Sequence, residues 1–210
     1  MVASRRILAA AGIVGPVVFT ILVGIQGMAH RDYSHLALPI SALAAWPHGW
    51  LQSLNFLTLA VLMTGFAVAF HRGVRPNKSA RIGPACFFVS AVGLALAGLF
   101  PWARIGNAFS VPRGHLVGAF MAFVGAGTGL LFMSRRMVKD AEWSHLAMYV
   151  AVSGAVTLLL FLVTVGSVRL PNAPLHDWAG LLQRVTVLVW FAATVVVSLR
   201  LLALEHVRRA

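Results

Sequence analysis

The chain alternates long apolar stretches with short polar connections. Each apolar stretch is close to the roughly 20 residues that an α-helix needs to cross the hydrocarbon core of a bilayer. Charged residues gather in the connections, where a helix would leave the membrane. The pattern predicts an all-α polytopic membrane protein, a six-transmembrane-helix bundle with helices at about 7–28, 51–70, 82–100, 114–133, 146–168 and 179–202.

Composition supports the membrane assignment. The 210 residues are 60% hydrophobic and only 10% charged, whereas soluble domains carry about 25% charged residues. The first apolar stretch is longer than the roughly 7 to 15 residues of a signal-peptide core, and Pro16 interrupts it, so we expect a retained helix. Since no linker or low-complexity segment divides the chain, we expect one membrane domain over residues 1–210.

The cations predict the orientation, because short cytoplasmic connections carry an excess of Lys and Arg. With six crossings, only Arg31, Arg104, Arg113, Arg169 and Arg184 fall on one side. The other side carries Arg5, Arg6, Arg72, Arg75, Lys78, Arg81, Arg135, Arg136, Lys139, Arg200, Arg208 and Arg209. Both termini are therefore expected to be cytoplasmic.

The arginines and lysines also predict the kind of organism and the binding partners of the protein. The excess of Arg over Lys is typical of GC-rich bacterial genomes, so we expect a multi-pass protein of the bacterial plasma membrane. The net charge of +12 is spread over short loops beside membrane helices, which favours membrane lipids as partners and excludes nucleic acid.

The external side is expected to attract anions. The second, fourth and sixth helices begin there, so their positive dipole ends and free backbone N–H groups face outward. The candidate ligand-binding residues are Arg184, Gln183, Arg113, Arg104, His115 and Asp32. We predict an outward-facing polar, basic pocket that binds a lipid headgroup or a small anionic ligand. Alternatively, the arginines only reach out to lipid phosphates without forming a site.

Histidines and aspartates on the same side leave enzymatic chemistry open. His115, His176 and Asp177 are candidate catalytic groups, and His115, His176 and Asp32 are candidate metal ligands, although their spacing matches no zinc motif. The alternative function is a membrane-embedded hydrolase or lipid-modifying enzyme, with or without zinc. No cofactor is indicated, because the histidines lie in loops or at helix ends rather than within the bilayer, where haem ligands would stand.

The fourth apolar stretch is rich in glycine. Gly114 and Gly118, and Gly125 and Gly129, have the spacing that lets a neighbouring backbone approach closely in lipid. This helix is therefore expected to be central in the bundle. The same spacing also permits a third function, an accessory subunit that packs against a membrane protein partner or a second copy of the chain.

Several short motifs occur in an order that resembles a known family. They are Gly15-Pro16, Tyr33 followed by Ile40-Ser41-x-Leu43, Gly98-x-Phe100-Pro101, Gly114-His115 and Gly180-x-x-Gln183-Arg184. They resemble the bacterial six-helix membrane proteins catalogued as domain of unknown function number 998, over nearly the whole chain. The resemblance implies a six-helix bundle and no established activity.

The chain departs from that family pattern at two places. The family often has an Asp after the Ile-Ser pair and another after the Phe-Pro pair, where this chain has Ala42 and Ala103-Arg104. If those carboxylates serve metal binding or acid-base chemistry in relatives, this protein lacks them, which favours a binding protein.

Overall fold

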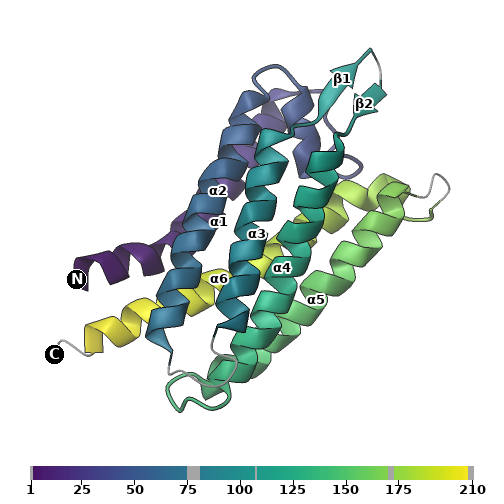
Figure 1. The fold of residues 1–210 in the computed structure, drawn as a ribbon. Helices are drawn as coiled ribbons and strands as arrows, with labels where there is room; N and C mark the ends of the chain where they lie inside the picture. Colours follow the sequence, from purple (N-terminus) through teal and green to yellow (C-terminus); the bar gives the residue numbers. More distant parts are fainter. Residues whose placement is uncertain (1, 75–80, 107, 170–172, 208–210) are drawn as a thin grey trace.

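A computed structural model describes residues 2–74, 81–106, 108–169 and 173–207. In these ranges six α-helices follow one another as an antiparallel bundle (Figure 1), which confirms the predicted all-α fold. The helices are α1 (Val2–Ala29), α2 (Trp50–Gly73), α3 (Ile82–Leu99), α4 (Arg113–Met137), α5 (Ser144–Arg169) and α6 (Ala179–Val207). All six contain a segment long and apolar enough to cross a membrane.

The two ends of the bundle differ. At one end the beginning of α1 and the end of α6 lie close together, and we call this the terminal end (Figure 1). The other, which we call the hairpin end, carries the short strands β1 (Ala103–Ile105) and β2 (Ala108–Ser110) and the 3-10 helices η1 (Ile40–Ala45) and η2 (His176–Trp178). Which end faces the cytoplasm stays a prediction from the cations.

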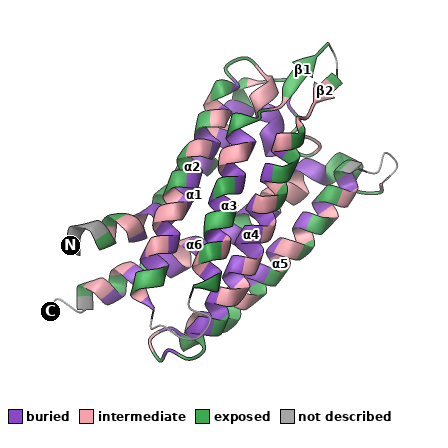
Figure 2. Ribbon diagram, in the orientation of Figure 1, coloured by how far each residue is buried: buried purple, intermediate pink, exposed green. Residues whose placement is uncertain are grey.

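The core runs along the bundle between the helices. Aromatic and sulfur-containing side chains fill it, among them Phe66, Phe87, Met133, Trp143 and Trp190. Figure 2 shows buried residues on the faces that the helices turn to one another and exposed residues on the outer faces. Many exposed residues are large and apolar, as expected of helices that face lipid.

Glycines set how closely α3 and α4 pack. A Cβ atom built on Gly93 would lie 2.5 Å from the carbonyl oxygen of Gly118, and one on Gly118 would lie 2.6 Å from the carbonyl oxygen of Gly93. The two backbones are therefore in direct contact, as the small-residue spacing predicts. Ser90 strengthens the contact, since its hydroxyl donates to the carbonyl oxygen of Ala122 at 2.7 Å.

The backbones of α4 and α5 are in contact at Gly127 and Gly154. A Cβ on Gly154 would lie 2.7 Å from the carbonyl oxygen of Gly127. From there the two helices spread apart toward the hairpin end (Figure 1). There the side chains of α4 and α5 line an open space.

The connection after α3 folds into a β-hairpin that the sequence analysis did not predict. Ala103 pairs with Ser110 and Ile105 with Ala108 in an antiparallel register. Gly106 has a φ of 60°, in the left-handed region that glycine adopts without a steric penalty. Strands of three residues are too short to leave an alternating pattern in the sequence.

Arg136 has a role beyond topology. Its side chain is 2% exposed, and its Nη2 atom donates to the carbonyl oxygens of His71, at 3.0 Å, and Val74. The guanidinium also lies over the ring of Phe70, 5.5 Å from the centroid. Arg136 therefore ties α4 to the end of α2 from inside the protein.

Candidate functional site

Arg184 fastens the connection between α1 and α2 to α6. Its Nη1 atom donates to the carbonyl oxygens of His35 at 2.8 Å, Leu38 at 3.1 Å and Gly180 at 2.9 Å. Its Nη2 atom donates to the Tyr33 hydroxyl at 2.5 Å. A planar guanidinium with five N–H donors suits several oxygens held at fixed positions. Most of its donors are therefore directed at the protein itself.

Tyr33 and Gln183 complete this attachment. The buried Tyr33 hydroxyl donates toward the carbonyl oxygen of Pro39 at 3.1 Å, and burial raises the pKa of Tyr33, so the hydroxyl keeps its proton. The Gln183 side-chain oxygen accepts a hydrogen bond from the backbone N–H of Ile40 at 2.6 Å. These contacts hold Ile40, the first residue of η1, in place, and thereby also position its neighbour Ser41.

His115 is buried in the first turn of α4. Its Nδ1 atom lies 3.1 Å from the carbonyl oxygens of both Ala97 and Phe100 on the α3 side. Carbonyl oxygens only accept hydrogen bonds, so Nδ1 carries the proton. In the neutral ring Nε2 is then an acceptor with a free lone pair.

Ser41, His115 and Gln183 line one cavity inside the hairpin end. It consists of two adjoining spaces, with volumes of about 30 and 150 Å³, that share these three residues with Ala119 and Phe123. The smaller space reaches into the core between α1, α2, α3 and α6, and the larger one extends between α4 and α5. We call the two together the hairpin-end cavity.

The larger space opens on the outer surface of the bundle, where α4 and α5 spread apart. Phe120 of α4 and Val165 and Val168 of α5 line it, with 58%, 38% and 39% of their surfaces exposed. These faces are the ones that membrane helices turn to lipid. The mouth of the cavity is therefore lateral, toward the hydrocarbon of the bilayer.

Five polar atoms of this cavity have no partner among the described residues. They are Ser41 Oγ, His115 Nε2, Gln183 Nε2 and the indole Nε1 atoms of Trp102 and Trp190. Ser41 is 4% exposed and His115 3%, so neither side chain is at the surface of the bundle. Buried polar groups are normally hydrogen-bonded, and an unsatisfied one costs about 1–3 kcal/mol. The five atoms thus mark where a ligand would gain polar contacts.

The chain matches the family described as Protein of unknown function (DUF998) over residues 13–200. It belongs to this family. No curated protein and no solved structure matches the chain. The family membership agrees with the resemblance carried by the sequence motifs and with the six helices.

Several motifs of the family resemblance meet in space at the hairpin end. Tyr33 bonds Arg184, and the Ile40 N–H bonds Gln183. A Cβ on Gly180 would lie 2.4 Å from the carbonyl oxygen of Leu38, so that glycine lets the segment before η1 approach α6. Motifs that lie far apart in the sequence therefore meet at the hairpin end, and their residues Ile40, Ser41, His115 and Gln183 line the hairpin-end cavity.

The remaining predicted site residues lie outside the cavity. Arg104, in β1, is exposed, with its guanidinium carbon 5.7 Å from the Trp46 ring centroid and its Nε atom donating to the carbonyl oxygen of Gly106. Arg113 begins α4 and is exposed. Their predicted contact with an anion stays a prediction.

The candidate metal ligands and acid-base groups are not gathered around His115. Asp32, His176 and Asp177 are exposed, and the Nδ1 atom of His176 donates to the carbonyl oxygen of Ser167 at 3.0 Å. In the part of the chain that the structure describes, no three His, Cys, Asp or Glu side chains form a group that could hold a metal ion. The hydrolase and the accessory subunit stay predictions.

Sequence reasoning singled out neither Ser41 nor the apolar walls as site residues. Ser41 stood in the Ile40-Ser41 motif of the family resemblance, and that was the one available signal. A buried amide cluster was also missed: Gln26 Nε2 donates to Gln52 Oε1 at 3.0 Å, and Asn55 Nδ2 donates to the carbonyl oxygen of Phe19 at 3.2 Å. It joins α1 to α2 beside the cavity wall that Phe19 forms.

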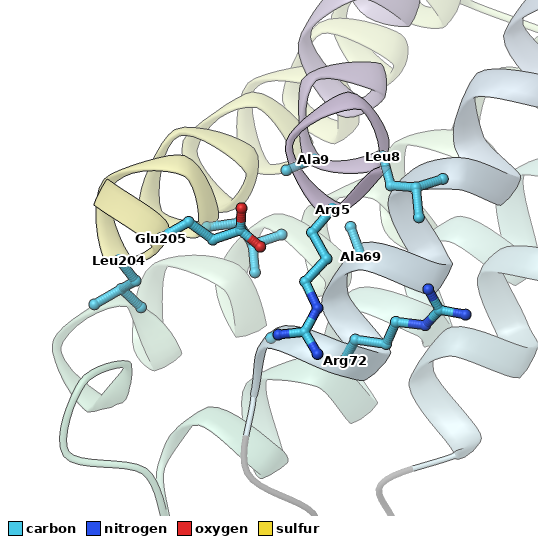
Figure 3. A pocket seen from close by; sticks show the side chains of 9 residues that line it. Arg5, Leu8, Ala9, Ala69, Arg72, Leu204 and Glu205 are labelled. Carbon is cyan, nitrogen blue, oxygen red and sulfur yellow. The ribbon is translucent and has the colours of Figure 1, made fainter. Parts of the chain in front are cut away.

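A second pocket, of about 20 Å³, lies at the terminal end. It is formed by the beginning of α1 and the ends of α2 and α6, and Figure 3 shows Arg5, Arg72 and Glu205 around it. None of the predicted site residues lies here. Its cations belong to the set that predicts the cytoplasmic side.

We expect the pKa of His35 to lie below its ordinary value near 6.5. Partial burial is the larger cause and the positive charge of Arg184 the second, because both disfavour the imidazolium. Arg184→Gln removes the charge and should raise the pKa of His35 toward the ordinary value. An NMR titration of ring-labelled histidine measures both values, and an unchanged pKa in the variant would contradict the electrostatic contact.

Proposed function

We propose that this membrane protein binds a lipid in the hairpin-end cavity. The lipid chain would enter between α4 and α5, and its polar group would reach Ser41, His115 and Gln183. The observation that carries the proposal is a laterally open apolar cavity with five unpartnered polar atoms in its lining.

The lining of the cavity supports a lipid. Ligand pockets in proteins are mostly apolar with a few placed polar groups. Here aromatic and aliphatic side chains form the walls, with the rings of Phe123 and Phe161 stacked at 4.9 Å between centroids. The exposed apolar faces of α4 and α5 at this mouth are those that would face lipid, so a lipid could enter from within the bilayer.

The proposal retains part of the function predicted from the sequence. It keeps the lipid ligand and the external end, and the distribution of cations would place this end outside the bacterial plasma membrane. It moves the polar contacts from the arginines to uncharged side chains. The ligand would then come from the outer leaflet.

Filling the cavity tests the proposal. Ala119→Trp places an indole against the part of the wall that both spaces share, so it should abolish lipid retention while the bundle remains folded. Native mass spectrometry of protein purified in mild detergent measures the bound lipid. Val117→Trp is the matched control, because Val117 is on the same helix, 53% exposed and not part of the lining. Equal lipid retention in Ala119→Trp and the wild type would refute the proposal.

A further inference from the structure

We infer that the hairpin-end cavity selects an uncharged lipid that ends in a hydroxyl group. The inference rests on the proposed function and adds the chemical class of the ligand. It comes from an inventory of the free polar atoms in the cavity and from the absence of charge among the described residues that line it.

The free atoms comprise one acceptor, three donors and one group that does both. Two of the donors are the indole Nε1 atoms of Trp102 and Trp190. The Nε2 atom of His115 is an acceptor, because Nδ1 already holds the proton against two carbonyl oxygens. The Nε2 atom of Gln183 is an amide donor, since its partner oxygen is fixed by the Ile40 N–H. The Ser41 hydroxyl donates and accepts.

A hydroxyl is the smallest lipid group that fits this inventory. Its proton can be donated to His115 Nε2, while its oxygen accepts from Gln183 Nε2 or Ser41 Oγ. An ester carbonyl or an ether oxygen only accepts, which would leave the imidazole lone pair unsatisfied by the ligand. An unsatisfied buried acceptor costs about 1–3 kcal/mol, so the difference should be measurable.

Charge argues against a phosphate or a carboxylate in the same place. The described residues that line the cavity include no Lys, Arg, Asp or Glu. Arg184 lines an adjoining groove between α1 and α6, which shares Phe19, Ile40 and Val187 with the smaller space. A buried ion without a partner of opposite charge is strongly disfavoured. The free lone pair of His115 would also repel an anionic oxygen. The arginines Arg104, Arg113 and Arg184 therefore lie outside the lining of the cavity that would hold the ligand.

Three lipid probes with the same single alkyl chain test the inference. Oleyl alcohol, oleyl methyl ether and oleyl phosphate share one chain and differ in their polar ends: donor and acceptor, acceptor only, and anion. We expect oleyl alcohol to bind the full-length protein roughly tenfold more tightly than the ether. We also expect it to bind more tightly than the phosphate. Titrations followed by native mass spectrometry give the three affinities.

Two variants test which residues cause the preference for the alcohol over the ether. His115→Asn keeps an N–H donor near Nδ1 and removes the Nε2 acceptor, so it should reduce the preference for alcohol over ether to less than about twofold. Ser41→Ala should weaken binding of the alcohol severalfold and serves as the second variant if His115→Asn does not fold. Ser198→Ala is the control, because Ser198 is fully buried, has no partner among the described residues and does not line the cavity.

The outcomes separate the inference from the proposed function. Equal binding of the alcohol and the ether, or tighter binding of the phosphate, would overturn the selectivity while the function stands, provided that Ala119→Trp still blocks binding. If none of the probes binds, or if Ala119→Trp blocks none of them, both the inference and the proposed function are wrong. Wild-type selectivity in Ser198→Ala with loss in His115→Asn supports the inference.

Discussion

Gly93→Ala is expected to destabilise the bundle by about 3 kcal/mol, the upper end of the usual cost of overpacking. The new Cβ would lie 2.4 Å from the backbone nitrogen of Ala122 and 2.5 Å from the carbonyl oxygen of Gly118. Both atoms belong to the backbone of α4, so no side chain can rotate away and the two helices must separate. Thermal unfolding in detergent measures the loss as a lower Tm.

Gly24→Ala is the matched control for this prediction. Gly24 is also within a membrane helix, but a Cβ there meets nothing within 4 Å. Alanine is a better helix former than glycine by about 0.5–1 kcal/mol, so this variant should be neutral or slightly more stable. Similar shifts of Tm in the two variants would contradict the claim that backbone contact between α3 and α4 holds the bundle together.

Gly93→Ala also links the packing of α3 and α4 to the hairpin-end cavity. His115 is held in its tautomer by the carbonyl oxygens of Ala97 and Phe100, at the end of α3. Separation of α3 from α4 would break these bonds and free Nδ1. Lipid binding should therefore fall together with stability in Gly93→Ala and remain unchanged in Gly24→Ala.

The six helices could be predicted because their signal is local. An uninterrupted apolar stretch of bilayer length is visible in the sequence without knowledge of its neighbours. The structure extends several of the predicted helices, for example α1 back to Val2 and α6 to Val207. Helical hydrogen bonding continues past the end of an apolar stretch, so composition underestimates the length.

The cavity could not be predicted because it depends on contacts between distant segments. Ser41 and His115 share a wall only because Gln183, 143 positions after Ile40, binds the beginning of η1. The spreading of α4 and α5 likewise follows from where Gly127 and Gly154 touch. Neither of these contacts between distant segments can be inferred from the hydrophobic periodicity or residue spacing within one apolar stretch.

Arg184 shows a further limit of prediction from the sequence. An arginine near the external end of a membrane helix can reach lipid phosphates or can bind the protein's own carbonyl oxygens, and the two cases have the same local sequence. The structure shows bonds to oxygens 149 and 146 positions away, in His35 and Leu38. The scaffold role thus becomes visible only after folding.

Arg184→Met is expected to destabilise the protein by about 2 kcal/mol. The change removes the donors to three carbonyl oxygens and to the Tyr33 hydroxyl, and the half-buried position lets water replace only part of these bonds. The segment that contains Tyr33 and Ser41 should then loosen. Hydrogen exchange of this segment and the Tm in detergent measure the two effects.

Arg184→Lys separates the scaffold from an anion site. If the geometry of the guanidinium matters, lysine should recover little of the stability lost in Arg184→Met, because a single ammonium cannot serve the acceptors that Nη1 and Nη2 divide between them. The loss should also be the same with and without added phosphatidylglycerol. If Arg184 instead binds a lipid phosphate in the groove between α1 and α6, lysine should recover most of the stability as a point charge. The loss in Arg184→Met would then be larger in anionic lipid, and this outcome would assign the anion site to Arg184 and reject the scaffold role.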